Sequence, residues 1–322
     1  MSADGPSRTL RCVRALVALG GNAMTRADGL ARPQDQIAAI GAAMEPVADL
    51  VARGHEVVLT HGNGPQVGNL LVKNELAASV VPPVPLDWCV AQTQATIGFV
   101  VLSALEAALV ARAVRRPVAA VVTRTLVDGS DPGFTSPSKP IGRYLPAAEA
   151  AVLVSHGETW QDRGPRGWRR VVASPEPLEV LDAPAVVALV SAGFVVVANG
   201  GGGIPCVRDT EDRLRGVEAV VDKDLGAALL ARAVQADVLV IATDVGHVAT
   251  AWGTPDQVEL DEVAVPVLRE LAERGSFAAG SMGPKVEAAC RFVEGGGTHA
   301  AICSLEAIAE AAHGRAGTVV HA

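Results

Sequence analysis

The chain has 322 residues, of which 49% are hydrophobic and 19% are charged, and its formal net charge is −8. This length allows two domains or one large α/β domain, and the composition excludes a largely disordered protein. The negative charge and the scarcity of aromatic residues, 3% of the chain, argue against a surface that binds nucleic acid by stacking its bases.

The sequence also argues against a membrane protein or a protein with its own metal cage. No run approaches the roughly 18 consecutive apolar residues of a membrane helix. Residues 1–11 are polar and lack the apolar stretch of a signal peptide, which predicts a cytoplasmic location. The five cysteines lie singly and without metal-ligand spacing, so we interpret them as reduced core residues. The seven histidines do not pair at ligand spacing either, so a metal would have to arrive with a ligand.

Short β-branched segments alternate with longer segments rich in Ala, Leu, Glu and Arg, which predicts strands and helices around a mostly parallel sheet. The predicted strands cover residues 13–19, 56–60, 117–123, 194–198, 238–242 and 299–303. The predicted helices cover residues 34–53, 91–115, 183–192, 223–234, 262–274, 286–294 and 305–312. The alternation stops between residues 124 and 174, a stretch rich in Gly, Pro, Ser, Asp and Arg, where we predict a small lid or protruding subdomain.

Glycine-rich segments follow three of the predicted strands. Gly20-Gly21-Asn22 follows the first strand, residues 61–68 follow the second, and residues 199–205 carry four consecutive glycines after the fourth. Successive glycines let backbone N–H groups point at an anion, although a plain tight turn is the simpler explanation of the first pair taken alone. Because the carboxyl ends of parallel strands meet at one edge of a sheet, three such loops predict one shared site.

Lysine is scarce in this chain: only four of its 27 basic residues are lysine. Lys139, Lys223 and Lys285 lie beside glycine, proline or aspartate. A compact ammonium in a tight loop suits a small transferring anion, such as a phosphoryl group, better than the wide fork of arginine does. The alternative is that these are ordinary surface lysines. Lys73, in a helical stretch that no motif includes, fits that alternative.

Asp222 and Asp224 flank one of these lysines, at the start of the helix predicted for residues 223–234. Asp222 is well placed to cap the helix, and capping alone would explain it. A second role is open, in which Asp222 orients lysines that would otherwise repel one another. Asp224 would then approach a magnesium ion or the substrate pocket. Positioning and charge neutralisation are nearly all that phosphoryl transfer asks of a protein.

Three common motifs are missing from the sequence. It contains no Walker-type phosphate loop and no Gly-x-Gly-x-x-Gly dinucleotide signature followed by a suitably placed acid. It also contains no Gly-x-Ser-x-Gly nucleophile elbow.

Taken together, the motifs resemble those of the carbamate kinases in the amino acid kinase family, over almost the whole chain. The matching segments are 18–23, 60–68, 85–87, 94, 97–99, 139–142, 169–175, 199–205, 218–224, 243–245 and 280–286. The segment that contains Lys139 distinguishes these kinases from most of their relatives, which typically carry a lysine in the first glycine loop. In this chain Leu19 precedes Gly20, and no lysine is near.

The resemblance implies a single domain over residues 1–322, built as a three-layer αβα sandwich with a mostly parallel central sheet, and a protruding lid subdomain at residues 124–174. It also implies a homodimer and a reversible, magnesium-assisted reaction of ATP with carbamate that gives ADP and carbamoyl phosphate. In the family this reaction often runs toward ATP.

The resemblance further implies a role for each matching residue. The catalytic residues would be Lys139, Lys223, Lys285 and Asp222, with Asp222 organising the lysines. The substrate and phosphoryl group would be bound by Gly20, Gly21, Asn22, Gly62, Asn63, Gly64, Gly201 and Gly202. The nucleotide would be bound by Thr243, Asp244 and Met282 together with Lys223 and Lys285.

Residues 246–252 depart from the family pattern. Gly246 stands where the family usually has an acid, and Ala251 where it has an asparagine, while Trp252 keeps the aromatic residue. The departure bears on nucleotide affinity or base preference more than on phosphoryl chemistry. His247 is either a surface residue or a replacement contact with the nucleotide.

Three hypotheses for the function follow. The first is a carbamate kinase. The second is a kinase of the same family that phosphorylates another small carboxylate, carbamate-like or phosphonate anion, motivated by residues 246–252. The third is a catalytically silent regulator that binds a nucleotide, and the presence of the three loop lysines and Asp222 argues against it.

Overall fold

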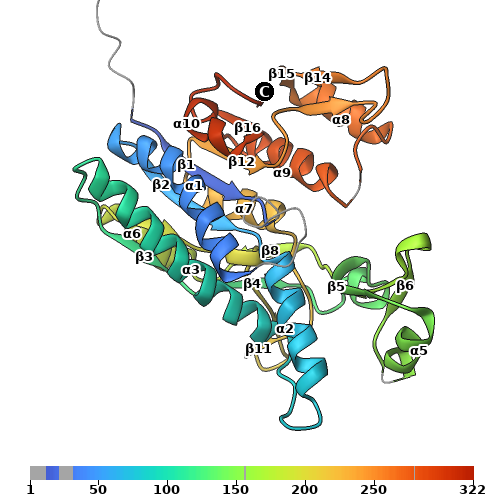
Figure 1. Cartoon of the computed structure of the whole chain (residues 1–322). Coiled ribbons are helices and arrows are strands. Elements are labelled where there is room, and N and C mark those ends of the chain that lie inside the picture. Colours follow the sequence, from blue (N-terminus) through green and yellow to red (C-terminus); the bar gives the residue numbers. More distant parts are fainter. Residues whose placement is uncertain (1–11, 22–31, 156, 279) are drawn as a thin grey trace, which may run out of the picture.

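The computed structural model describes residues 12–21, 32–155, 157–278 and 280–322. An eight-stranded sheet lies at its centre (Figure 1). Its strands, in spatial order, are β15 (Glu262–Ala264), β17 (Thr318–His321), β16 (His299–Ser304), β12 (Val238–Thr243), β1 (Arg14–Leu19), β2 (Glu56–His61), β9 (Val195–Val197) and β3 (Val118–Ala120). Every neighbouring pair is parallel except β16 with β17, which confirms the mostly parallel sheet predicted from the sequence.

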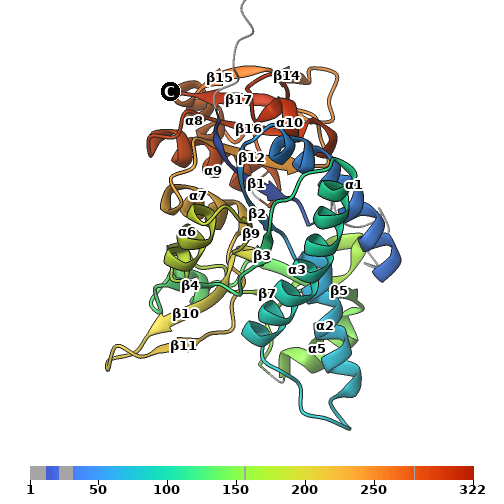
Figure 2. The same cartoon turned by 90° about the vertical axis from the view of Figure 1, so that its left-hand side faces the viewer.

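Helices cover both faces of this sheet. In β1, Leu16 and Ala18 pack into one core cluster, and Val17 and Leu19 pack into the other. One helical layer contains α1 (Pro33–Ala52), α3 (Leu86–Ala111) and α10 (Ile308–Ala311). The other contains α6 (Ala183–Ser191), α7 (Lys223–Ala233), α8 (Val265–Glu273) and α9 (Met282–Glu294). Figure 2 shows the sheet between the two layers, so the predicted αβα sandwich is confirmed.

Smaller sheets extend this framework. A four-stranded sheet has the order β11 (Leu214–Gly216), β10 (Ile204–Arg208), β4 (Arg124–Val127) and β8 (Pro177–Val180). The strands β13 (Val248–Thr250) and β14 (Val258–Leu260) form an antiparallel hairpin. The remaining short helices are α4 (Pro132–Thr135), η2 (Gly164–Arg166), η3 (Gly200–Gly202) and η4 (Leu305–Ala307).

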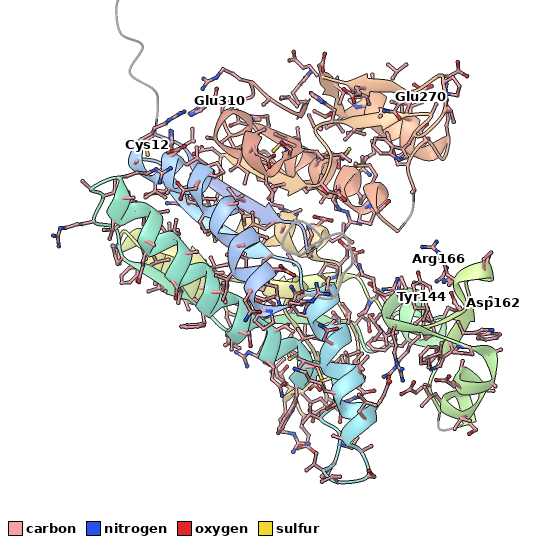
Figure 3. The ribbon with its side chains drawn as sticks, viewed as in Figure 1. Cys12, Tyr144, Asp162, Arg166, Glu270 and Glu310 are labelled. Atoms are coloured by element: carbon pink, nitrogen blue, oxygen red, sulfur yellow. The ribbon has the colours of Figure 1, made fainter. Side chains whose placement is uncertain are left out.

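A third small sheet stands away from the central sheet, beside α2 (Gly64–Ala77), as Figure 1 shows. It consists of β5 (Lys139–Leu145), β7 (Trp168–Val172) and β6 (Trp160–Asp162), all antiparallel, and packs on α5 (Ala147–Ser155). We call this sheet together with α5 the lid. The lid carries Tyr144 and Arg166, which Figure 3 labels. The guanidinium carbons of Arg166 and Arg169 lie 5.7 and 5.0 Å from the ring centroid of Tyr144. The segment expected to protrude, residues 124–174, begins with β4, which belongs to the four-stranded sheet. The part that stands away is therefore residues 139–172.

Two local predictions differ from the structure. Residues 262–264, predicted as the start of a helix, form the strand β15, because they pair with β17 and the helix α8 begins only at Val265. The helix α2 was not among the predicted helices, although Lys73 was placed in a helical stretch, because its first turn lies inside the glycine-rich segment 61–68. Pro65 in its first turn was the available signal, since proline is well tolerated there.

The helix α3 is long and apolar. Among the described residues, it is the one helix that is long and apolar enough to cross a membrane, with a mean hydropathy of 1.7. The core helices of soluble proteins also meet this criterion of length and composition. One side of α3 packs against α1 and β3. The large apolar side chains of Trp88, Phe99 and Val110 are exposed on α3. The helix thus covers the sheet and also carries an outward apolar surface.

We predict that Leu59→Ala lowers the free energy of unfolding by about 2–5 kcal/mol, because Leu59 is fully buried in β2 and its loss leaves a cavity. Urea unfolding measures the change. Ile37→Ala, at a residue of α1 that is 55% exposed, is the control and should change stability by less than about 0.5 kcal/mol. Equal losses in the two variants would contradict the proposed packing of the central sheet.

Candidate functional site

A pocket of about 430 Å³ opens where four parallel strands end. The loops that follow β1, β2, β9 and β12 all reach it, as expected for one edge of a parallel sheet. The lid contributes the start of β5, and the segment before α9 contributes the opposite wall. Of the residues assigned to the site from the sequence, those that line this pocket are Gly20, Gly21, Gly62, Asn63, Gly64, Lys139, Gly201, Asp222, Lys223, Thr243, Asp244, Met282 and Lys285.

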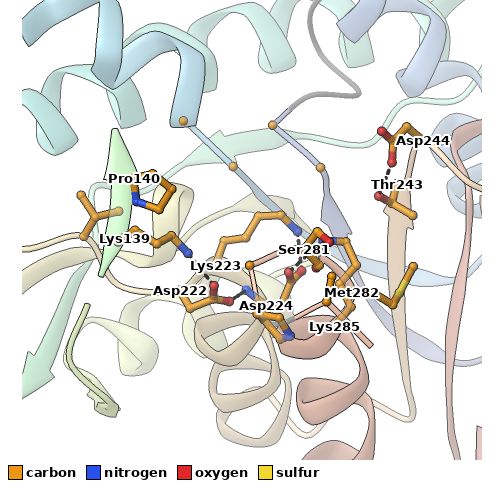
Figure 4. Close-up of a pocket in the computed structure, with 18 of the residues that line it drawn as sticks. Lys139, Pro140, Asp222, Lys223, Asp224, Thr243, Asp244, Ser281, Met282 and Lys285 are labelled. Carbon is orange, nitrogen blue, oxygen red and sulfur yellow. Dashed lines mark hydrogen bonds and ion pairs between the residues drawn. The ribbon is translucent and has the colours of Figure 1, made fainter. Parts of the chain in front are cut away.

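The three loop lysines lie together in this pocket, each against a carboxylate (Figure 4). The ammonium of Lys139 donates to Asp222 Oδ2 at 2.6 Å. Lys223 and Lys285 share Asp224: Lys223 donates to its Oδ1, and Lys285 donates to its Oδ2 at 3.3 Å. Lysines from a lid strand, from α7 and from α9 thus meet around two neighbouring aspartates.

The helix α7 explains how the two aspartates reach different lysines. Asp222 caps the helix, because its Oδ1 accepts from the backbone N–H of Asp224 at 2.9 Å. Its other oxygen is left for the lysine of the lid. Asp222 therefore caps the helix and also holds the lysine of the lid, whereas the contacts with Lys223 and Lys285 are made by Asp224. Asp224 lies in the first helical turn and is only 2% exposed. From the sequence it was considered for a magnesium ion or the substrate pocket, and its pairing with two lysines was not predicted.

Burial and charge shift the pKa values of this cluster in opposite directions. Burial raises the pKa of Asp222, but the ammonium of Lys139 and other neighbours outweigh it, so the pKa lies below its ordinary value and the carboxylate stays charged. For Lys223 burial is the largest effect and lowers the pKa, opposed by the Asp224 carboxylate. The carboxylates thus hold positive charge in a place where burial alone would remove it.

Two glycine loops approach each other closely at one end of the pocket. The backbone N–H of Gly62 donates to the carbonyl of Leu19 at 2.9 Å, which continues the pairing of β1 with β2. A Cβ atom on Gly62 would lie 2.7 Å from the backbone nitrogen of Gly21, and no side chain fits at that distance. Gly201 has a φ of 67°, and a Cβ there would strike the side-chain amide of Asn63. These positions therefore require glycine.

Gly202 differs from Gly201, because it does not line the pocket. Its backbone N–H donates to the Asn199 carbonyl at 3.0 Å, so it is already engaged and is not available to a bound anion. This corrects the expectation that Gly202 is among the residues that bind the substrate and phosphoryl group. Asn22 lies outside the described residues, so its assignment stays a prediction.

The helix α2 begins at the same end of the pocket. Its first internal hydrogen bond runs from Val67 to the Asn63 carbonyl, and in the described part of the chain the N–H groups of Asn63 and Gly64 have no acceptor. Free N–H groups at a helix N-terminus favour a bound anion. The side chain of Asn63 is held by a bond from its Nδ2 to Thr93 Oγ1 at 2.9 Å.

The other end of the pocket is more apolar. Val245, Ala249, Trp252, Phe277 and Met282 line it. The hydroxyl of Thr243 donates to Asp244 Oδ1 at 3.0 Å (Figure 4). An apolar wall with a few polar groups at its edge suits a flat, partly polar ligand such as a nucleobase.

The divergent segment 246–252 contributes to this apolar end only in part. Trp252 lines the pocket, although it is 61% exposed. His247 does not line it. Its ring nitrogens lie 3.6 Å from Glu259 and 3.5 Å from Asp261, on the hairpin side. Of the two alternatives for His247, the structure favours the surface residue.

The pocket offers no ready-made cage for a metal ion. Within residues 12–21, 32–155, 157–278 and 280–322, no group of three His, Cys, Asp or Glu side chains is placed to hold one. The oxygens of Asp222 and Asp224 are already engaged by lysines or by the backbone. A divalent ion at this pocket would therefore have to bring ligands with it.

Comparison with known proteins gives concordant results. A family model described as the amino acid kinase family matches residues 14–304. The carbamate kinase of Thermococcus kodakarensis is 44% identical over 311 residues, which cover 95% of this chain and 98% of that protein. The carbamate kinase-like protein YqeA of Escherichia coli is 43% identical, with 95% and 98% covered. The structure of a carbamate kinase from Giardia lamblia bound to AMP-PNP has a TM-score of 0.90 at 37% identity, with 97% and 99% covered.

We predict that Asp224→Asn lowers the free energy of unfolding by about 3–5 kcal/mol at neutral pH, because two buried ammonium groups lose their shared counter-ion. The defect should shrink as the pH rises, because burial lowers the pKa of Lys223 and its ammonium, once deprotonated, no longer needs a counter-ion. Urea unfolding over a pH series measures both effects.

Asp212→Asn is the matched control, since Asp212 pairs with Arg208 at the surface with its side chain 83% exposed. It should cost less than about 1 kcal/mol. If Asp224→Asn lowered the free energy of unfolding as little as Asp212→Asn does, the lysine cluster would not need the Asp224 carboxylate.

Proposed function

The chain belongs to the amino acid kinase family, and we propose that it is a carbamate kinase, which transfers a phosphoryl group reversibly between ATP and carbamate to give ADP and carbamoyl phosphate. The observation that carries the proposal is the meeting of Lys139, Lys223 and Lys285 in one pocket at the ends of the parallel strands. As a member of this family the chain is a phosphotransferase.

The three ammonium groups fit the charge that phosphoryl transfer develops. In the transition state, negative charge spreads over the three equatorial oxygens of the phosphoryl group and over the attacking and leaving oxygens. Ammonium groups aimed at these oxygens stabilise the charge most where water is excluded. Lys223 and Lys285 have side chains only 15% and 14% exposed. The two aspartates keep the lysines apart and charged until the substrate arrives.

The two ends of the pocket suit different substrates, carbamate at one end and the nucleotide base at the other. The free N–H groups of Asn63 and Gly64 and the open backbone of the glycine loops suit the carboxylate of carbamate. Trp252 and Met282 at the apolar end suit the base of the nucleotide. The lysines lie between, where the transferred group would pass. Carbamate carries its own negative oxygen, so the protein needs no general base to create the nucleophile.

Magnesium would enter with the nucleotide, held by phosphate oxygens and water. When bound, it would neutralise phosphate charge beside the lysines. Asp224 lines the pocket and has suitable chemistry for the ion, but it would first have to release a lysine.

The test of the proposed function is ATP formation from carbamoyl phosphate that depends on ADP. We expect turnover in the folded protein. A folded wild-type chain that binds ADP but forms no ATP would overturn the proposal and favour a silent nucleotide-binding regulator.

A second candidate acceptor comes from the divergent segment 246–252, part of which borders the pocket. The alternative is a kinase that phosphorylates another small carboxylate, carbamate-like or phosphonate anion. A panel of such anions, with ATP consumption as the readout, separates the two. Carbamate as the best acceptor supports our proposal, and a clear preference for another anion supports the alternative.

We predict that Lys223→Ala and Lys285→Ala each lower kcat by about 10²–10³-fold, the usual effect of removing one donor to a developing oxyanion. Lys139→Arg should lose activity as well, because the wide, planar guanidinium of arginine cannot replace the compact ammonium that pairs with Asp222. Steady-state kinetics with carbamoyl phosphate and ADP measure the losses. Lys73→Ala, at an exposed position of α2, is the control and should keep full activity. Wild-type kcat in either alanine variant would refute the assignment.

A homodimer and a cytoplasmic location are also part of the proposal. The strand β3 forms one edge of the central sheet, and Phe99 and Val122 beside it are 67% and 55% exposed. A second copy of the chain would cover such an apolar edge. All five cysteines are free, which suits a reducing compartment.

We predict that Phe99→Glu shifts the protein from dimer to monomer, because a charge would then lie in the apolar contact. Light scattering coupled to size-exclusion chromatography measures the mass. Val267→Glu, at an exposed residue of α8, is the control and should leave the mass unchanged. A monomeric wild-type chain, or a dimer that tolerates Phe99→Glu, would rule out this surface as the interface.

A further inference from the structure

We propose that His61 is a positioning residue for the carbamate end of the pocket: its ring holds the carbonyl of Gly62 and thereby aims the backbone N–H of Asn63 at the substrate. The inference deepens the proposed function and rests on it for the identity of the substrate. His61 is the last residue of β2 and is only 2% exposed. None of the roles described above uses it.

The hydrogen bond of His61 has one possible direction. Its Nδ1 lies 2.9 Å from the carbonyl oxygen of Gly62. A carbonyl only accepts, so Nδ1 must carry the proton, and the ring is the tautomer with a free Nε2. The N–H of Gly62 is also held, by the carbonyl of Leu19. Both polar groups of this glycine are therefore fixed by its neighbours.

Fixing the Gly62 carbonyl also fixes the next N–H group. In a planar trans peptide the C=O and the following N–H point in opposite directions, so the N–H of Asn63 points away from the His61 ring. The Asn63 nitrogen would lie 3.6 Å from a Cβ on Gly21, on the side of the two pocket-lining loops. Glycine peptides reorient easily, and without the imidazole bond the Gly62–Asn63 peptide would be free to turn.

The ring of His61 is itself held in place. A Cβ on Gly200 would lie 2.4 Å from its Cε1 and Nε2 atoms, so the backbone of the third glycine loop packs directly on the imidazole. Gln94 fixes that loop, because its Nε2 donates to the Gly200 carbonyl at 3.0 Å. Thr60 adds a bond from its hydroxyl to the Asn199 carbonyl at 2.9 Å. His61 thus connects two glycine loops of the pocket through one rigid ring.

The surroundings keep the ring neutral, as this role requires. The pKa of His61 is lowered to about 4, mainly by burial and also by the charge of Lys223, against a partial increase from the bond to Gly62. The Lys223 side chain passes close by, since its Cδ atom would lie 3.1 Å from a Cβ on Gly62. A neutral ring next to this lysine donates its hydrogen bond without adding charge to the lysine cluster.

Two substitutions separate the hydrogen bond from the packing. His61→Leu removes the donor, and His61→Asn, of similar shape, places an amide N–H near the position of Nδ1. For His61→Leu we expect kcat/KM for carbamoyl phosphate to fall about 10–100-fold, with KM for ADP unchanged, because only the carbamate end is misaligned. His61→Asn should stay within about threefold of wild type, because its amide can donate the same single hydrogen bond.

His55→Leu is the matched control. His55 immediately precedes β2, is 1% exposed, and also has a pKa lowered mainly by burial, but it lies at the other end of the strand. This variant should lose thermal stability without a selective change in KM. An equal defect in His61→Asn and His61→Leu would overturn the proposal. The proposal would also be overturned if His61→Leu lost activity toward both substrates equally, and only in proportion to the fall in its melting temperature, as expected for His55→Leu.

A binding measurement keeps this inference separate from the proposed function. Calorimetry with phosphonoacetamide, a stable analogue of carbamoyl phosphate, needs no turnover. If the wild-type protein forms no ATP, the proposed function fails. The positioning role of His61 still stands in that case if His61→Leu binds the analogue at least tenfold more weakly than both the wild type and His61→Asn. Equal binding by the three proteins, or no binding by wild type, overturns the role of His61.

Discussion

The site depends on one electrostatic constraint: three ammonium groups must be held close together, largely out of water, without losing their protons. Burial alone favours the neutral form of Lys223. Two aspartates at the start of α7, its N-cap Asp222 and Asp224 in its first turn, resolve this conflict. Asp222 takes the lysine of the lid while it caps the helix, and Asp224 takes the lysines of α7 and α9. The same two carboxylates therefore fix the start of a helix, tie the lid to the sandwich and keep the positive charge in place.

The central sheet makes this arrangement possible. Since β1, β2, β9 and β12 are parallel, their carboxyl ends deliver three glycine loops and the Thr243–Asp244 pair to one edge. The glycines let the backbone approach so closely that the loops touch, as Gly62 and Gly21 do. That contact leaves amide groups rather than side chains facing the substrate, and His61 holds one of these amides from behind. Under the proposed function, backbone donors and lysines would together bind one anion.

Much of this could be predicted from the sequence, because strand periodicity, loop glycines and rare lysines are local signals. The mostly parallel sheet and the αβα layers follow from them, and the structure brings Lys139, Lys223 and Lys285 into one pocket. The pairing of Asp224 with two lysines could not be predicted, since it depends on which way each aspartate points at the start of α7, and no local pattern specifies that. The engaged amide of Gly202 and the burial of His61 depend on loop packing that no local pattern specifies.

The central claim is that the three lysines bind the transferring phosphoryl group together. It is tested most directly by a crystal structure with ADP, magnesium, carbamate and aluminium fluoride, which mimics that group. The account predicts the Nζ atoms of Lys139, Lys223 and Lys285 at hydrogen-bond distance, about 3 Å, from the fluoride or the phosphate oxygens that flank it. Lysines that stay on Asp222 and Asp224, with the fluoride bound elsewhere, would contradict it.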